Sequence, residues 1–531
     1  MSNQSNNSEQ EQQPSQSAPR PFPNSDYIRP GIDDRPDLDK ALSAADKAAV
    51  ARLALRQKPV TAEPAISHPE VQATALAESR GIPNAAADEP IPDVNSAFFD
   101  MRDPMVDSTG YRPTSSQVLN MKIGFSLCAF LISFVMVALT VVLVPMQLDM
   151  FANADVKTHT VANGINAGVN MCILMSIGIV VTMLTTALAS ALSDHTRTIL
   201  GRRTPWLFAG TVLTGLFAFA LPSCSTAVSL TIVWAFMQLG YAIMLMSLSA
   251  MIGEMVPDKF RGSIATWRDV MMFAGSLCGV AFATSMASHS RVLAMAVCGI
   301  LMLAAGVVAV VVPPREHSSE YLHVSTLKTS SVLAAFRPPH GVRNWGWIVA
   351  IRLLISATLA VSATYIWFVV FYGIGVGTSF TTSLATLAAM AVVAYVMAAV
   401  ASVLLDPITA HMSNFTALWL SGLCLLLSAI CGMTLHTQIG LLLFAAFGGF
   451  ALSMLDSLAQ SVVVNSIEDL QHTGRVLAVV RSLDNAGRLI GVIAGAIVFS
   501  LAGAFTSLFT VAGALSAALM LVIIAGRKHF A

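Results

Sequence analysis

The stretch Ser190–Trp206, SALSDHTRTILGRRTPW, decides the fold. It gathers one acidic and three basic side chains in a chain of which only 11% of the residues are charged. No Asp, Glu, Lys or Arg occurs in the 36 residues 158–193 before it or in the 50 residues 204–253 that follow Arg203. A membrane-spanning helix needs about 20 apolar residues, and a short basic turn between such runs is typical of a cytoplasmic loop. The stretch therefore predicts a polytopic membrane protein.

The composition of the 531 residues agrees with this interpretation. Hydrophobic residues make up 55% of the chain, and the mean hydropathy is +0.69. The net charge is zero and no basic patch is interleaved with aromatic residues, so we expect no nucleic-acid partner. The sequence contains no GxxxxGK[ST] phosphate loop, no HExxH motif and no Ser/His/Asp cluster. We therefore expect neither an enzyme nor a metal or cofactor site.

The distances between charged residues predict an all-α membrane fold with twelve spans. An uncharged run of 20 to 36 residues holds one span, and a run of about 50 residues holds two. The single-span runs are 123–148, 158–193, 270–290 and 292–314, and the double-span runs are 204–253, 353–405 and 407–455; the last two spans share 475–526, which contains a few charged residues. Within the double runs we expect turns near 222–225, 373–377, 436–438 and Gly503.

The basic residues predict the orientation of the spans. Connections on one side of the membrane contain only Lys157 and Arg291. Those on the other side contain twelve basic residues: Arg197, Arg202, Arg203, Lys259, Arg261, Arg315, Lys328, Arg337, Arg343, Arg475, Arg527 and Lys528. Basic loops remain in the cytoplasm, so we expect a multi-pass protein of the plasma membrane with both termini cytoplasmic.

Four segments make up the predicted domain organisation. Residues 1–117 are polar and rich in Pro, Ser, Gln and Asn at the start, which predicts a largely disordered cytoplasmic tail with a short helix over 37–57. Residues 118–312 form a first six-helix bundle, 313–344 a cytoplasmic central loop, and 345–531 a second six-helix bundle.

The two bundles repeat each other at an offset near 213 residues. The matching pairs are Asp194 and Asp406, Trp206 and Trp419, Glu254 and Glu468, and Arg268 and Arg481. Such a repeat predicts a duplicated fold whose transport pathway lies between the halves.

The quoted stretch resembles the loop between helices 2 and 3 of the major facilitator superfamily, and most closely its longer form in the glycoside–cation and sucrose-type symporters. Met255–Gly262, MVPDKFRG, is similar to the loop after helix 4 in many bacterial members. The resemblance implies twelve helices in two pseudo-symmetric halves and a secondary transporter that works by alternating access. Ser190 and His195 depart from the Gly and Arg of the family, and the second copy, Asp406–Trp419, has no basic residue.

The resemblance also implies a latch between the halves. Asp194 would lie beside the start of helix 11, where a helix N-terminus and a cation such as Arg475 would stabilise its carboxylate by about 0.3–2 kcal/mol. The paired arginines of the loop would pair with Glu254 or Asp258, bind lipid phosphate, or only set the topology. The predicted cytoplasmic gate comprises Asp194, Arg197, Gly201, Arg202, Arg203, Glu254 and Arg475.

Charged residues inside a span are candidates for function because their burial is costly. Arg481, Asp484 and Arg488 are spaced by three and four residues, which predicts one shared helical face. Measured from Arg475 at 1.5 Å per residue, Asp484 lies about 13 Å and Arg488 about 20 Å into the membrane. We predict that Asp484 and Arg488 belong to the substrate and proton pathway. The alternative is an Asp–Arg pair that only closes the bundle.

Two further charged residues belong to the predicted pathway. Asp456 in helix 10 is a candidate proton acceptor, because burial disfavours the charged form of a carboxyl group. Alternatively, it pairs with Arg352 in helix 7 or with helix 11.

Amide side chains suggest a cavity for hydroxyl-rich solutes. Helix 2 carries an amide ladder at three- and four-residue spacing, and helices 1 and 4 add further polar groups; the residues are Asn163, Asn166, Asn170, Gln147, Gln238 and Tyr241. The alternative is polar contact between helices, which is common in membranes. Helix 2 has no acidic residue before Asp194, whereas melibiose-type sodium symporters use such residues, so we expect coupling to protons.

These observations predict a proton-coupled secondary transporter that imports a sugar or glycoside. One alternative is a proton-coupled exporter of drugs or other amphipathic solutes, which the 26 Met and 26 Phe residues would suit. The other is a receptor or scaffold that uses the same fold without transport. The expected partners are a small solute, protons and membrane lipid, and we expect a monomer.

Overall fold

The computed structural model describes residues 112–154, 160–316, 344–374, 380–435, 437–466 and 473–527. The chain divides into two compact units. The larger comprises Ser115–Val256 and Phe260–Ala531, and the smaller comprises Met1–Thr114 and Pro257–Lys259. Almost all of the smaller unit, including the helix predicted over 37–57, lies outside the described residues, as does most of the predicted central loop.

Twelve helices of the described residues are long and apolar enough to cross a membrane, as predicted, and no strand occurs among those residues. The first six spans are α5 with η1 and α6 (Ser115–Ala152), α7 (Val161–His195), α8 with η2 (Thr204–Ser223), α9 (Ala227–Met255), α10 (Asp258–Ala287) and α11 (Arg291–Val311). The second six are α13 with α14 and η3 (Trp345–Thr364, Ile366–Phe368 and Val369–Ile374), α15 (Phe380–His411), α16 (Asn414–Thr434), α17 (Gln438–Asn465), α18 (Thr473–Ala502) and α19 (Ser507–Ala525).

Hydroxyl side chains begin several of these helices. The Thr160 hydroxyl accepts a hydrogen bond from the backbone N–H of Asn163 at the start of α7. Thr226 and Ser229 form a reciprocal capping box at the start of α9. These caps satisfy backbone groups that have no partner within the helix. The apolar runs therefore have defined ends, and the turn predicted near 222–225 lies between η2 (Leu221–Ser223) and α9.

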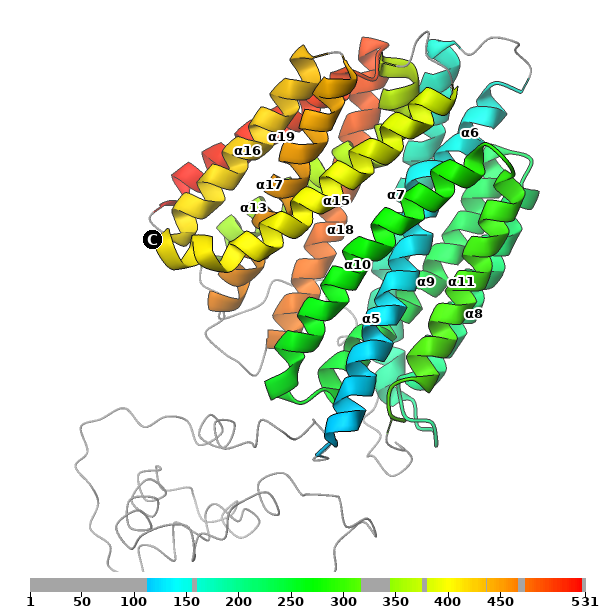
Figure 1. Cartoon of the computed structure of the whole chain (residues 1–531), viewed down its shortest axis with the longest axis vertical. Coiled ribbons are helices and arrows are strands. Elements are labelled where there is room, and N and C mark those ends of the chain that lie inside the picture. The colour runs from blue at the N-terminus through cyan, green and yellow to red at the C-terminus, as the bar shows by residue number, and fades with distance from the viewer. Residues whose placement is uncertain are drawn as a thin grey trace, which may run out of the picture. The chain divides into compact units, whose positions relative to one another are not determined.

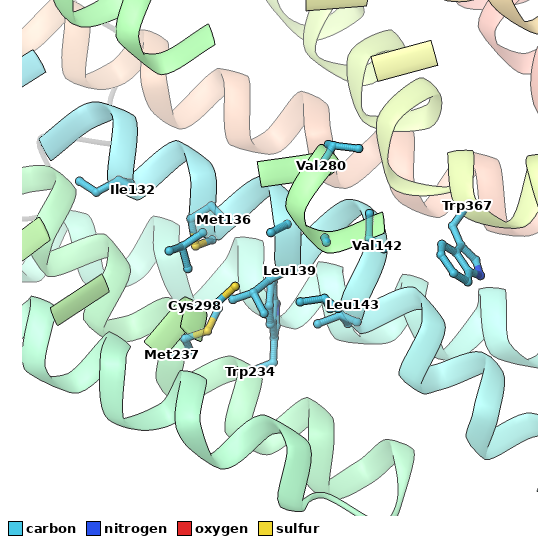
Figure 2. Close-up of a cluster of buried hydrophobic side chains, with 14 of the residues drawn as sticks. Ile132, Met136, Leu139, Val142, Leu143, Trp234, Met237, Val280, Cys298 and Trp367 are labelled. Carbon is cyan, nitrogen blue, oxygen red and sulfur yellow. The ribbon is translucent and has the colours of Figure 1, made fainter. Parts of the chain in front are cut away.

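The first six helices share a core of large apolar side chains. Leu139 and Leu143 of the π-helical turn η1 lie beside Trp234 of α9, and Cys298 of α11 lies in the same cluster (Figure 2). All four side chains are fully buried. The outer surface is apolar too, since α7 exposes Ile173, Ile177, Val180, Leu184 and Leu188 at helical spacing. An exposed apolar stripe of this length is suited to lipid.

Glycines allow the closest helix contacts, and they repeat between the halves. A Cβ atom at Gly275 or Gly279 of α10 would lie 2.2 or 2.3 Å from a backbone carbonyl oxygen of α5. A Cβ atom at Gly487 or Gly491 of α18 would meet backbone oxygens of α13 at 2.7 and 2.2 Å. Both glycine pairs have four-residue spacing, and the second follows the first by 212 residues. This offset agrees with the predicted duplication.

The bundle has two chemically different ends. We call the end at which α7 ends and α8 begins the basic end, because the connection there contains Arg197, Arg202 and Arg203. The opposite end is the end at which α7 begins. In Figure 1, α18 lies in the middle of the bundle, and it packs against α13 and α19 of its own half and α7 of the other.

Candidate functional site

Arg203 is the centre of a charged cluster at the basic end. Its guanidinium donates to Glu254 Oε1 at 2.8 Å, to Asp194 Oδ1 at 2.5 Å and to the Ser193 hydroxyl at 2.8 Å. Arg202 binds the same Glu254 carboxylate at 2.8 Å. Helices α7 and α9 and the loop before α8 are joined in this way. The expected pairing of the two arginines with Glu254 is thus present.

The environment of Arg203 keeps it charged. Burial alone would lower the pKa of Arg203, but hydrogen bonds and attraction from Glu254 and Asp194 outweigh burial and raise it. A raised pKa contributes stability at every pH below the pKa of arginine in the unfolded chain, which is already far above neutral. The contribution is lost only above that pH, so Arg203 holds the cluster together across the physiological range.

Glu316, which follows α11, completes this cluster and was not among the predicted site residues. Its carboxylate accepts hydrogen bonds from the backbone N–H groups of Arg202, Arg203 and Thr204 at 2.9 to 3.1 Å. Gly201 makes room for it: its φ is +93°, and a Cβ atom there would lie 2.3 Å from the carboxyl carbon of Glu316. Glu316 thereby places a negative charge at the N-terminus of α8, where the helix dipole favours it.

The latch expected between Asp194 and the start of helix 11 stays a prediction for a state that is closed at the basic end. Asp194 forms its ion pair with Arg203, within its own half of the molecule. The loop turns back through Gly201, whose φ is positive, and Arg203 lies 2.5 Å from this carboxylate. Arg475 belongs to α18, but its side chain is outside the described part of the structure. Arg197 donates to the carbonyl oxygens of Asp194 and Thr196.

Inside the membrane, Arg352 connects three helices of the second half. Its guanidinium donates to Asp484 of α18 at 2.5 and 2.9 Å and to Asp456 of α17 at 2.9 Å. The Arg352 side chain is only 8% exposed, whereas that of Asp456 is 67% exposed. Ser356, one turn further along α13, donates a third hydrogen bond to Asp484. The alternative that paired Asp456 with Arg352 is therefore the one present.

The three charged residues of helix 11 lie on one broad face of α18 but have different partners. A three-residue step turns a helix through about 300°, so Asp484 lies about 60° away from Arg481 and faces α13. A seven-residue step brings Arg488 back to within about 20° of Arg481. Arg481 donates to the Ser249 hydroxyl of α9 at 3.3 Å. Asp484 therefore pairs with Arg352 and not with Arg488.

Two of the residues predicted to line an amide-rich cavity, Gln147 and Asn163, make hydrogen bonds within the first half of the chain. Gln147 is fully buried and donates to the carbonyl oxygens of Leu221 and Cys224, which binds α6 to the end of the third span. Asn163 donates to Asn153 near the opposite end. Among the described residues, Asn166 and Asn170 have no hydrogen-bond partner, and Gln238 packs beside Gly178. Helical spacing predicts which residues share a face of a helix. It does not predict which neighbouring helix packs against that face at each depth of the bundle.

The two halves are held together at the opposite end by Tyr372. Its hydroxyl, from η3 of the second half, donates to the carboxylate of Asp149 in α6 and accepts a hydrogen bond from Asn153 at 3.1 Å. The ring of Tyr372 packs on Gly164 at the start of α7. Nearby, Phe499 and Phe505 cover Gly168. These contacts close the bundle at the opposite end.

A cavity of about 590 Å³ lies between the halves. It is lined by α10, α13, α15 and α17, and it reaches from apolar residues such as Phe444 to the charged side chains of Arg268, Asp269 and Asp456. Because α10 begins and α15 and α17 end at the basic end, the charged part of the cavity is its basic side. In the described residues, no group of three His, Cys, Asp or Glu side chains is arranged to hold a metal ion.

The sequence profile of the Major Facilitator Superfamily matches residues 123–438, so the chain belongs to this family of transporters. No curated protein sequence matches the chain significantly. Among solved structures, the nucleoside transporter NupG has a TM-score of 0.59 and 12% identity, over 77% of this chain and 99% of its own. The human organic anion transporter MFSD10 (TETRAN) has a TM-score of 0.52 and 15% identity, over 77% of this chain and 99% of its own. At these identities the likeness concerns the fold alone.

Proposed function

We propose that this family member is a proton-coupled secondary transporter that moves a small organic solute by alternating access. The ion-pair triad of Arg352, Asp456 and Asp484 carries this proposal. It joins three helices of one half, and its exposed member, Asp456, lines the cavity between the halves. A proton that enters the cavity from water reaches Asp456 first. Its binding would release Arg352 from one partner and so change the packing of α13 against α17.

The state of the bundle supports alternating access. The halves are joined at the opposite end through Tyr372 and Asp149, while the cavity extends toward the basic end. Charge bias further supports a cytoplasmic basic end in the plasma membrane. Cysteines introduced at Ile199 and Val228, which are 73% and 71% exposed near the two ends, test this orientation. A membrane-impermeant thiol reagent applied to intact cells should label Val228→Cys only, and labelling of Ile199→Cys would reverse the orientation.

Two solute classes remain candidates. Import of a sugar or glycoside is supported by the resemblance of the loop Ser190–Trp206 to the sugar-transporting branches, since the amide ladder lends no further support. Export of an amphipathic solute is favoured by the apolar lining of the cavity, which includes Met272, Phe273, Leu387 and Met390.

Proteoliposomes with a pH-sensitive dye in the lumen test the proposed coupling. Solutes of both classes are added outside under an acid-outside gradient, and proton entry is recorded. We expect solutes of one class either to enter together with protons or to enter in exchange for protons that leave the lumen. Asp456→Asn and Asp484→Asn should abolish this flux and leave solute exchange without a gradient measurable. Gradient-driven accumulation that persists in both variants would contradict the assignment of the triad.

A further inference from the structure

The charges between the halves are not balanced. In the described residues of this region, four guanidinium groups face three carboxylates. Arg352 engages both Asp456 and Asp484, and Arg268 pairs with the adjacent Asp269 at 2.8 Å. All three carboxylates are thus within ion-pair distance of other arginines. Arg481 and Arg488 of α18 are the remaining cations.

Arg481 and Arg488 form one row that points at the other half of the molecule. They are two helical turns apart, about 10 Å along α18. Arg481 hydrogen-bonds to Ser249 of α9, and Arg488 lies two turns further along the same face of α18. Both side chains are exposed although they lie inside a span. The hydrogen bond of Arg481 to α9 places this face of α18 toward the first half of the chain.

Neither arginine has a carboxylate within ion-pair distance among the described residues. Since Arg268 and Arg352 already engage the three carboxylates, Arg481 and Arg488 add positive charge between the halves. Charge of one sign in a cleft with low-dielectric walls concentrates ions of the other sign. A planar guanidinium matches the geometry of a carboxylate or phosphate, to which it donates two parallel hydrogen bonds.

We infer that Arg481 and Arg488 bind the negatively charged group of the transported solute, which is therefore an organic anion that carries a carboxylate or phosphate. This inference rests on the proposed transport function and narrows its solute class. The less polar remainder of the solute would extend toward the cavity between the halves, which is lined by side chains such as Met272 and Phe273. A neutral sugar would leave both guanidinium groups without a counterion.

Matched pairs of probes that differ only in charge test the inference. The full-length chain is placed in nanodiscs of neutral phosphatidylcholine, and its Tm is measured with phenylacetate against phenylacetamide and with D-glucuronate against D-glucuronamide. Binding to the folded state raises the Tm. We expect at least one acid to raise the Tm in a saturable way and its isosteric amide to leave it unchanged. Equal shifts from acid and amide, or no shift from either acid, would overturn the inference.

Variants assign the effect to the two arginines. Arg481→Gln and Arg488→Gln should each weaken the apparent affinity for the acid at least tenfold, while Arg481→Lys and Arg488→Lys should recover part of it. Arg291→Gln is the matched control, because Arg291 lies at the opposite end and contacts Met150. An unchanged affinity in both Gln variants would overturn the inference. Folding of each variant is checked by its Tm without ligand.

Two further experiments are needed. One tests whether the bound anion is a lipid or a solute, and the other separates the anion inference from the proposed transport function. Nanodiscs that contain anionic phosphatidylglycerol test whether a lipid phosphate fills the site. If the acid no longer raises the Tm in these nanodiscs, and this loss depends on the two arginines, the site binds lipid and the solute inference is overturned. In proteoliposomes, proton-driven uptake of a neutral glycoside that is unaffected by Arg488→Gln would overturn the anion inference alone. Acid binding without flux under any imposed gradient would instead overturn the transport function.

Discussion

Arg352 shows how a single residue can hold one half of this transporter together. It is almost fully buried, and both of its carboxylate partners come from other helices. A buried charge in a membrane protein is tolerated where it is paired in this way. The three residues are far apart in sequence, with 104 and 132 residues between Arg352 and its partners.

Replacement of Arg352 by Gln should destabilise the folded protein. The change leaves Asp484, which is 16% exposed, without its counterion. Breaking a buried pair from one side costs about 3–5 kcal/mol. We expect a fall of this size in the free energy of unfolding, measured by denaturant titration in mixed micelles, whereas Arg291→Gln should change it little. If Arg352→Gln lowered the free energy of unfolding by less than Arg291→Gln does, the triad would not be a stabilising contact.

Glu316 acts at the residue scale too, although it belongs to no predicted motif. Replacing it by Gln keeps one acceptor oxygen but removes the negative charge at the start of α8. Loss of an N-terminal cap costs about 0.5–2 kcal/mol. We expect a destabilisation in this range by the same titration. Asp269→Asn, which removes a carboxylate that is 45% exposed, should have an effect below about 0.5 kcal/mol, and an equal effect of the two variants would contradict the capping role.

At the scale of elements, small residues decide which helices pack closely. The equivalent glycine pairs of α10 and α18 bring each helix onto the first helix of its own half. Small residues at such contacts are typical of membrane helices, because they let backbones approach each other. The same contact occurs twice, 212 residues apart, and therefore belongs to the duplicated architecture rather than to a local site.

Gly279→Leu should disrupt the packing of α10 on α5. The backbone oxygen of Phe134 would lie 2.3 Å from the new Cβ atom, and backbone cannot move aside as a side chain can. Overpacking of this kind costs about 1–3 kcal/mol or more. We expect lower yield of folded protein and a lower Tm. Gly262→Leu in the same helix is the control, since no atom lies within 4 Å of a Cβ there; equal Tm values for the two variants would contradict the contact.

The elements themselves could be predicted because charge is so scarce in the spans. Twelve spans and their turns follow from uncharged runs, and the repeat offset is visible in charged and aromatic residues. Contacts between helices could not be predicted in the same way. Spacing places Asp484 on a helix, but only the fold brings Arg352 to it. The pairs Gly275 and Gly279 and Gly487 and Gly491 were a usable signal, since both show small residues at four-residue spacing.

Residues of the basic loop illustrate the same limit. Pairing of the loop arginines with Glu254 follows from their positions at neighbouring helix ends. The partner of Asp194 depends on the backbone path through Gly201, which charge counting does not reveal. The hydrogen bonds of Gln147 to Leu221 and Cys224 equally depend on how deep each helix lies in the bundle.

For the whole molecule, the central claim is that two six-helix halves alternate between openings at the two ends. Tyr372 and Asp149 close the opposite end, and the cavity extends toward the basic end. Tyr372→Phe removes the hydroxyl that joins the halves but keeps the ring on Gly164. This substitution should therefore shift the population toward the state that is open at the opposite end.

Distances between spin labels at both ends measure this shift most directly. Labels are attached in nanodiscs to exposed positions, Val161 with Phe380 at the opposite end and Leu200 with Met412 at the basic end, in a background without the seven native cysteines. Relative to the unsubstituted chain, Tyr372→Phe should lengthen the distance at the opposite end and shorten the distance at the basic end. A longer distance at the opposite end with no change at the basic end, or no change at either, would contradict the account.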